Sequence, residues 1–187
     1  MENSIRPSGA LLGKPSWLTG GFYAARCHLT ATVENVDGYR TGNDAVANFV
    51  SRWHFTIEWG HCDPAGIVFN SRFFEFFDWG AWRLFEAALG VRPPDIAAAF
   101  GIMGLPLVDT GARFLAPARF GDAVELTSEV SEFRRSSFDV AHRLYVRGEL
   151  AVEGRETRVW AVRDAADPAK IRSHPVPDAV MARFRVP

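Results

Sequence analysis

The sequence predicts an α+β fold in which an antiparallel sheet of about five strands is wrapped around one long helix. Residues 71–89 predict the helix because they are apolar around most of a helical circumference, as is typical of a buried helix. Five other segments predict the sheet, since they alternate apolar and polar residues as strands with one buried face do. Short connections between them favour antiparallel pairing of consecutive strands.

The predicted helix carries only a narrow polar stripe, formed by Arg72, Glu75, Arg83 and Glu86. The aromatic and aliphatic residues around the rest predict packing in the core rather than stacking against a cofactor. Gly80 lies in the middle, where glycine costs stability relative to alanine, so we expect a neighbouring backbone to approach closely there. Gly90 is expected to end the helix.

The strand candidates are residues 53–59, 105–115, 122–133, 137–146 and 150–162. Alternation in the first of them predicts that His54 points outward. The connections at 118–121 and 147–148 are short, so consecutive strands are expected to pair. Two prolines in 92–95 predict a break before a short helical piece at 96–100, and a second short helix is expected at 178–184.

The length of 187 residues is enough for one domain with a full core plus an extension. Residues 1–48 are interrupted by prolines and glycines and show no sustained period, so we expect a loosely ordered extension there. It has three interpretations: an accessory segment, a processed leader, or a start assigned too far upstream. Residues 49–187 are expected to form the domain.

Composition excludes several classes of function. The formal net charge is −1 and the basic residues are not clustered, which argues against a general nucleic-acid binder. No apolar run is long enough to cross a membrane, and the first residues lack the pattern of a secretory signal. Cys27 and Cys62 form no metal-ligand cluster, so the sequence predicts no metal or cofactor and a reducing, cytoplasmic setting.

Chemistry is concentrated in residues 59–70, which read WGHCDPAGIVFN between a strand and the long helix. Pro64 pushes Asp63 toward extended geometry and Gly66 permits backbone angles closed to other residues, so the loop is expected to have one defined shape. The first N–H groups of the following helix lack intrahelical partners and suit an oxygen that gains negative charge. A carboxylate and an oxyanion site are therefore expected to be neighbours.

The stretch Cys-Asp-Pro-Ala-Gly-Ile-Val-Phe at 62–69 resembles the signature of the 4-hydroxybenzoyl-CoA thioesterase branch of the hotdog-fold acyl-CoA thioesterases, Asp-x-x-Gly-hydrophobic-Val-aromatic. The likeness extends through 101–108 and 133–138 and covers about residues 53–162. The resemblance implies the hotdog fold and hydrolysis of an acyl-CoA thioester, with hydroxybenzoyl and benzoyl groups among the candidate acyl groups. It also implies a homodimer or homotetramer whose sites are shared across the dimer interface.

In this interpretation Asp63 attacks the thioester or acts as general base on water, and the sequence leaves both roles open. The oxyanion donors are expected at the backbone N–H groups of Phe69, Asn70 and Ser71. Relatives carry tyrosine or histidine where this chain has Asn70, which leaves the acyl specificity open and gives Asn70 either an acyl contact or a helix-capping role. His61 lies two residues from Asp63, and we favour a structural role for it.

Coenzyme A carries phosphates, so a near-neutral protein that binds it is expected to gather cations locally. The resemblance implies phosphate contacts at Arg134 and Arg135, with Ser136 in place of the third cation that the family usually has. Arg113 and Arg119 are further candidates. Without the resemblance, a pair of arginines at a turn would be interpreted as a solvated surface feature.

Two other functions are compatible with such a scaffold. One is a non-catalytic module that binds acyl thioesters or regulates another protein. The other is a hotdog dehydratase, but those enzymes use a histidine-centred site, and the sequence Asp63-Pro64-Ala65-Gly66 argues against it.

Overall fold

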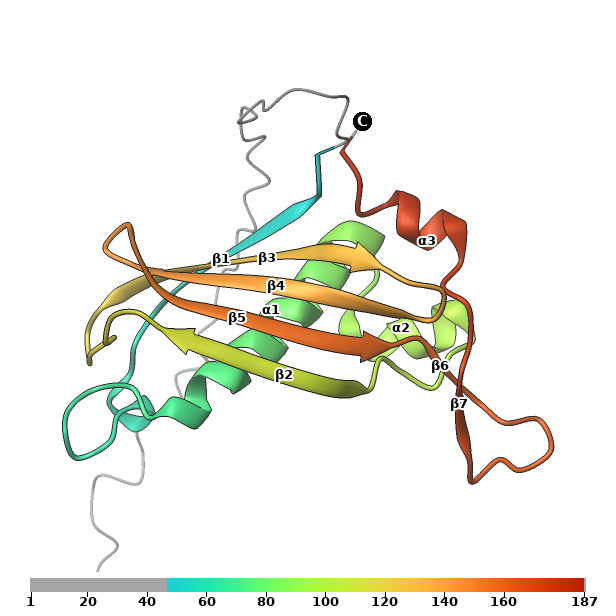
Figure 1. The fold of residues 1–187 in the computed structure, drawn as a ribbon, viewed down its shortest axis with the longest axis horizontal. Coiled ribbons are helices and arrows are strands. Elements are labelled where there is room, and N and C mark those ends of the chain that lie inside the picture. The colour runs from blue at the N-terminus through green and yellow to red at the C-terminus, as the bar shows by residue number, and fades with distance from the viewer. Residues whose placement is uncertain (1–46, 187) are drawn as a thin grey trace, which may run out of the picture. The chain divides into compact units, whose positions relative to one another are not determined.

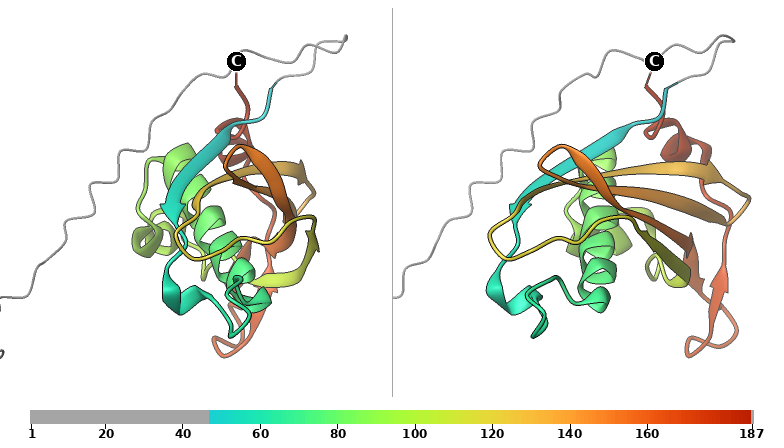
Figure 2. Two further views of the ribbon diagram at one scale, coloured as in Figure 1. Left: turned by 90° about the vertical axis from the view of Figure 1, so that its left-hand side faces the viewer. Right: turned by 60° about the vertical axis from the view of Figure 1, so that its left-hand side comes forward.

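The computed structural model describes residues 47–186, which form a five-stranded antiparallel sheet in the order β1-β3-β4-β5-β2 (Figure 1). Figure 2 shows the strands curving around the long helix α1, as the sequence predicted. The strands of the sheet are β1 Val50–Thr56, β2 Leu107–Phe114, β3 Ala123–Phe133, β4 Ser137–Val146 and β5 Glu149–Val159. The remaining elements are α1 Asn70–Leu89, α2 Pro93–Phe100, α3 Asp178–Ala182, the 3₁₀ turn Trp59–His61 and the small hairpin of β6 Ala161–Arg163 and β7 Ile171–Ser173.

Helix α1 packs into the hollow of the sheet through its aromatic face. A Cβ at Gly80 would lie 2.7 Å from Ser128 Oγ and 2.8 Å from Leu126 Cδ2 on β3. Glycine is needed there because side chains of the sheet pack against the helix, so the expected close approach of a backbone was wrong. Gly90 ends the helix in the left-handed region, at φ 69°, and its N–H donates to the Glu86 carbonyl. Within the described residues, no helix is both long and apolar enough to cross a membrane.

The core has two hydrophobic clusters along α1. One packs Leu84 and Phe85 of the helix against Phe138 and Trp160. The other packs Phe73, Phe76 and Phe77 against residues of β1, β3, β4 and β5, including Ile57, Leu126, Leu144 and Val152. This second cluster lies beneath the loop that follows β1, so it supports the segment in which the sequence predicts chemistry.

The prediction that all consecutive strands pair was wrong for β2 and β3. The β3–β4 and β4–β5 pairs follow the sequence order, but β2 pairs with β5 and β3 pairs with β1. The connection from β2 to β3 passes over the end of the sheet instead of closing a hairpin. It is held there by the loop after β1: the Val68 N–H donates to the Ala118 carbonyl, and the Ile57 N–H donates to the Asp122 carbonyl, each at 2.9 Å.

Helix α2 begins at Pro93, three residues before the predicted piece at 96–100. Its two prolines occupy the first helical positions, where the missing N–H has no intrahelical acceptor in any helix. The interpretation of these prolines as a break was therefore wrong, because they start the helix.

Most of the predicted extension, residues 1–48, lies outside the described residues, and that boundary stays a prediction. Its last two residues are described and pair with the end of the chain. The Val186 N–H donates to the Ala47 carbonyl at 2.7 Å, and Asn48 forms an antiparallel bridge with Arg185. Next to them the Phe49 N–H donates to the Phe184 carbonyl at 2.9 Å.

These contacts set where the chain can be shortened. Removing residues 1–44 should leave melting temperature and activity close to those of the full chain, because β1 and its flanking contacts remain. Removing residues 1–49 deletes two backbone hydrogen bonds and the Phe49 side chain, and should lower the free energy of unfolding by at least about 2 kcal/mol. Urea unfolding of both truncations checks this, and loss of folding in the shorter deletion would contradict it.

Candidate active site

The loop between β1 and α1 folds back on itself with Asp63 at its tip. Cys62 and Val68 pair as an antiparallel bridge, and the Asp63 N–H donates to the Ile67 carbonyl at 2.9 Å. The turn is closed by the Gly66 N–H, which donates to the Asp63 carbonyl at 2.9 Å, with Gly66 at φ 73°. A residue with a side chain would be strained at this angle, so Gly66 fixes the loop as the sequence predicted.

The carboxylate of Asp63 has one oxygen engaged. Its Oδ1 accepts the Ala65 N–H at 2.8 Å, which forms an Asx turn. Asp63 is half-buried, and its Oδ2 has no hydrogen-bond partner among the described residues. One oxygen therefore orients the side chain, while the other is available to a ligand or to a water molecule.

Helix α1 begins directly after this loop. Phe69 is its N-cap residue, and the Phe69 N–H donates to the His61 carbonyl at 2.9 Å, so this amide is already engaged. Asn70 and Ser71 occupy the first two helical positions, where N–H groups have no intrahelical acceptor. Both residues are exposed. Asn70 does not occupy the capping position, so the capping interpretation of its side chain was wrong.

His61 serves as a brace within the loop. Its Nδ1 accepts the Glu58 N–H at 3.0 Å, its ring contacts the Phe76 ring edge-on at 5.1 Å, and its carbonyl holds the Phe69 amide. Neither ring nitrogen has a hydrogen bond to Asp63. This geometry supports the structural role expected for His61.

Arg134, Arg135 and Ser136 form the turn between β3 and β4. The Arg134 guanidinium donates to Asp139 at 2.9 Å and to Glu132 at 2.7 Å. The hydrogen bond to Asp139 raises the pKa of Arg134, and its counterpart lowers the pKa of Asp139. Arg135 is exposed, and among the described residues no carboxylate pairs with it. Ser136 uses its carbonyl to accept the Trp160 N–H.

These residues lie at the opposite end of the sheet from Asp63 (Figure 1). Ala123, at the start of β3, pairs with Thr56 beside the Asp63 loop, whereas the arginine turn follows the last residue of this 11-residue strand. A strand of that length spans about 35 Å. One chain therefore brings together Asp63, Phe69 and Asn70, but not Arg134, Arg135 and Ser136.

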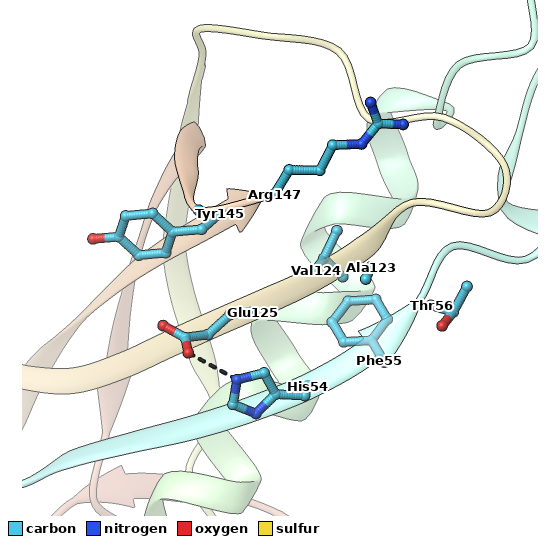
Figure 3. Close-up of a pocket in the computed structure, with 9 residues that line it drawn as sticks. His54, Phe55, Thr56, Ala123, Val124, Glu125, Tyr145 and Arg147 are labelled. Atoms are coloured by element: carbon cyan, nitrogen blue, oxygen red, sulfur yellow. Dashed lines mark hydrogen bonds and ion pairs between the residues drawn. The ribbon is translucent and has the colours of Figure 1, made fainter.

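A shallow cavity of about 660 Å³ lies on the outer face of β1, β3 and β4 (Figure 3). His54 lines it, as expected for an outward-facing residue, and its Nε2 lies 2.8 Å from Glu125 Oε2. Arg147 also lines the cavity and pairs with Asp122. The cavity contains neither Asp63 nor any other predicted site residue, so it belongs to the outer surface of the sheet.

Sequence reasoning missed a polar network buried between α1 and the sheet. Ser128 Oγ lies 2.8 Å from His142 Nδ1, and His142 Nε2 lies 3.6 Å from Glu156 Oε2. The Arg158 guanidinium donates to Glu156 at 2.9 Å and also pairs with Asp78 of α1. All but Asp78 are buried at their strand positions. The sequence did contain a signal for this network: Ser128, His142 and Glu156 occupy strand positions that face the core together with apolar residues of β3, β4 and β5.

This network resembles a serine–histidine–carboxylate relay in its order, but the Phe77 ring stacks on the His142 ring at 5.0 Å and closes it off. Burial lowers the pKa of His142, which keeps the ring neutral. Burial favours the neutral acid at Glu156, but the contacts with His142 and Arg158 outweigh it and hold the pKa of Glu156 below its usual range. The network therefore ties α1 to the sheet and has no access for a substrate.

Three comparisons identify the family. Residues 57–184 match the model of the thioesterase-like superfamily. The chain is 33% identical to 4-hydroxybenzoyl-CoA thioesterase of Pseudomonas sp. strain CBS-3 over 114 residues, which cover 58% of this chain and 80% of that protein.

Within the described residues, no group of three or more His, Cys, Asp or Glu side chains could hold a metal ion.

Solved structures agree with this assignment. The 4-hydroxybenzoyl-CoA thioesterase from the same Pseudomonas strain superposes with a TM-score of 0.64 at 28% identity, covering 73% of this chain and 99% of that one. A gentisyl-coenzyme A thioesterase superposes with a TM-score of 0.58 at 29% identity, covering 71% and 98%. These matches confirm the resemblance found in the loop and the predicted hotdog fold. The chain therefore belongs to the thioesterase-like superfamily and has the hotdog fold of its acyl-CoA thioesterases.

Proposed function

We propose that this protein hydrolyses a CoA thioester of an aromatic or similarly compact acid, with Asp63 acting on the thioester carbon or on the attacking water. Thioester hydrolysis is the reaction of the family to which the chain belongs. The relatives named for 4-hydroxybenzoyl-CoA and gentisyl-CoA support an aromatic acyl group. The observation that carries the proposal is the Asp63 carboxylate, held by the Ala65 N–H in a loop that leads directly into α1.

Two routes give the same products. In the first, Asp63 attacks the thioester carbon, CoA leaves as the thiolate, and water then hydrolyses the mixed anhydride to regenerate the carboxylate. In the second, Asp63 removes a proton from water as the water attacks, and the tetrahedral intermediate expels CoA. Both consume one water and yield one acid and one thiol. An aspartate-to-asparagine mutant of 4-hydroxybenzoyl-CoA thioesterase, solved with 4-hydroxybenzoyl-CoA bound, supports a reacting aspartate in this family.

The oxyanion of either intermediate would be stabilised by the N–H groups of Asn70 and Ser71. Their position at the start of α1 adds the positive end of the helix dipole to two backbone donors. The Phe69 amide donates to His61, so we assign Phe69 the task of fixing the direction of the helix start. The Asn70 side chain is free to contact the acyl group, since it is exposed and makes no capping bond.

We further propose that the protein is a homodimer or a tetramer of dimers. Among the described residues, strand β2 has one unpaired edge, and Leu107 and Val108 on it are 44% and 60% exposed, a surface that would promote pairing with a second chain. Assembly would also let the Arg135 turn of one chain serve the Asp63 loop of the other. Sedimentation at micromolar concentration tests this, and monomers alone would contradict it.

Arg135 is the better candidate for a phosphate contact, because Arg134 is already paired with Asp139 and Glu132. Arg135→Ala should raise KM for a full-length acyl-CoA several-fold with little change in kcat, since a contact far from the reacting carbonyl contributes uniform binding. Arg134→Ala should raise KM less. Thioesters truncated to N-acetylcysteamine should not respond. An unchanged KM in both variants would mean that Arg134 and Arg135 are surface charges and that their turn, which includes Ser136, does not contact CoA.

The proposal is tested by a panel of aromatic and aliphatic acyl-CoA substrates, with release of free thiol as the readout. Multiple turnovers on a hydroxylated benzoyl-CoA are expected. Tight binding of the panel without thiol release would instead favour a non-catalytic acyl-thioester module. A CoA substrate and the free thiol of Cys62 also favour the reducing cytoplasm as its location.

A further inference from the structure

Two aromatic rings stand exposed beside the Asp63 loop. Trp59 is 70% exposed and Phe120 is 60% exposed, and their rings meet edge-on with centroids 5.8 Å apart. Trp59 belongs to the 3₁₀ turn after β1, and Phe120 belongs to the connection between β2 and β3. Aromatic residues, tryptophan above all, are enriched on surfaces that bind a partner or a ligand.

Backbone contacts place both rings next to the candidate active site. The Trp59 carbonyl accepts the Cys62 N–H at 3.1 Å, and Cys62 immediately precedes Asp63. On the other side Arg119, which precedes Phe120, forms an antiparallel bridge with Ile67, and the Ile67 carbonyl accepts the Asp63 N–H. Trp59 and Phe120 therefore lie together beside the base of the loop that carries Asp63.

Arg119 adds an uncompensated positive charge at the same place. It is exposed, and no carboxylate pairs with its guanidinium in the part of the chain that the structure describes. Arg147 and Arg72 are different, because Arg147 pairs with Asp122 at 2.8 Å and Arg72 with Glu75 at 2.7 Å. The Arg119 backbone is fixed, since its N–H donates to Asp122 Oδ2 at 2.8 Å.

We propose that Trp59, Phe120 and Arg119 form a nucleotide platform, on which the adenine of CoA stacks against the aromatic pair while Arg119 binds a CoA phosphate. This inference rests on the proposed function. Base–aromatic stacking needs an exposed π-face and no specific hydrogen bonds, and a guanidinium is suited to phosphate oxygens. CoA carries a 3′-phosphate and a pyrophosphate, so Arg119 and Arg135 need not compete for one group.

Charge decides between a nucleotide and a second copy of the chain as the occupant. An interface between copies would desolvate the Arg119 guanidinium, with which no carboxylate of the described residues pairs, and this is unfavourable. A nucleotide brings the phosphate that pairs with it. Only a ligand that is both aromatic and anionic therefore supplies a partner for the exposed rings and for the Arg119 guanidinium.

The platform is tested with Trp59→Ala, Phe120→Ala and Arg119→Gln in the full chain. The probe is adenosine 3′,5′-bisphosphate, titrated by calorimetry, together with KM for an acyl-CoA and for the matching N-acetylcysteamine thioester. Each aromatic variant should weaken bisphosphate binding and raise KM for the acyl-CoA about tenfold. The response of the N-acetylcysteamine thioester should be far smaller, because it lacks the nucleotide.

Matched controls are Trp79→Ala, an exposed tryptophan on α1 that is 58% exposed, and Arg172→Gln on β7. Both should bind the bisphosphate as the parent does. Unchanged bisphosphate binding in the three platform variants would overturn the inference while thioester hydrolysis stands. If bisphosphate binding were unchanged and the variants also sedimented as smaller species, the platform would be an interface between copies of the chain, and the inference would again be overturned. If the parent released no thiol, the proposed function would fail, and the bisphosphate titration would still judge the platform by itself.

Discussion

Asp63→Asn is expected to lower kcat for a CoA thioester by a factor of about a hundred to ten thousand, the range for losing a positioned acid–base group, without loss of folding. In the parent, Asp63 Oδ1 accepts the Ala65 N–H at 2.8 Å. Asparagine retains an Oδ1 that can accept the same N–H, so the Asx turn should persist. The amide cannot attack a thioester or take a proton from water at neutral pH. Thiol release and melting temperature measured on the same samples check this expectation.

Asp63→Ala is the control that separates chemistry from loop structure. Alanine has no acceptor for the Ala65 N–H, so it should lose activity together with some thermal stability. If Asp63 only shaped the loop, the asparagine variant would retain most activity and only the alanine variant would lose it. An active asparagine variant would therefore remove Asp63 from the mechanism.

The second large effect is expected at Arg158, in the network beneath α1. Arg158→Met should lower the free energy of unfolding by about 3–5 kcal/mol, the cost of removing one partner of a buried pair. The Glu156 side chain, 1% exposed, would then keep only the neutral His142 beside it, and Asp78 would lose its contact with the sheet. Urea unfolding at neutral pH measures the change.

Two further variants make this result specific. Arg113→Met removes an arginine from an exposed pair with Glu153, so it should change stability little. Adding Glu156→Gln to Arg158→Met removes the uncompensated charge and should recover part of the lost stability. A small effect of Arg158→Met, equal to that of Arg113→Met, would mean that the network contributes nothing to holding α1 on the sheet.

The same network should make the protein sensitive to acid. The pKa of His142 is lowered by burial, so the unfolded chain binds a proton below about pH 6.5 that the folded chain does not. The lowered pKa of Glu156 acts in the same direction at lower pH, since the unfolded carboxylate takes up its proton first. Stability should therefore decrease as pH falls below about 6.5. Urea midpoints that stay constant from pH 7 to pH 5 would contradict this.

Local patterns predicted the elements well. Residues 137–146 place Phe138, Val140, Leu144 and Val146 in register on one face and form β4 with these bounds, and α1 begins only one residue before its predicted start. The Asp63 loop was also predictable, because Pro64 and Gly66 act on their own neighbours and the turn needs no distant partner. The family resemblance then supplied the hotdog fold, which periodicity alone could not distinguish from other α+β folds.

Properties that depend on distant contacts were not predictable. The length of the β2–β3 connection did not reveal that it crosses the end of the sheet, since its partners are Ile57 and Val68. The engagement of the Phe69 amide by His61 and that of Arg134 by Asp139 depend in the same way on how the loop and the strands fold back. His142 and Glu156 were visible in the sequence, but their pairing requires the register of β4 against β5.

We propose that the Asp63 end of this fold hydrolyses a CoA thioester. The most direct test is thiol release from 4-hydroxybenzoyl-CoA by the full-length protein, followed alongside the disappearance of the thioester bond. Multiple turnovers are expected, at a rate proportional to protein concentration, with one acid formed for each thiol. Binding of this and the other acyl-CoA substrates without thiol release would contradict it.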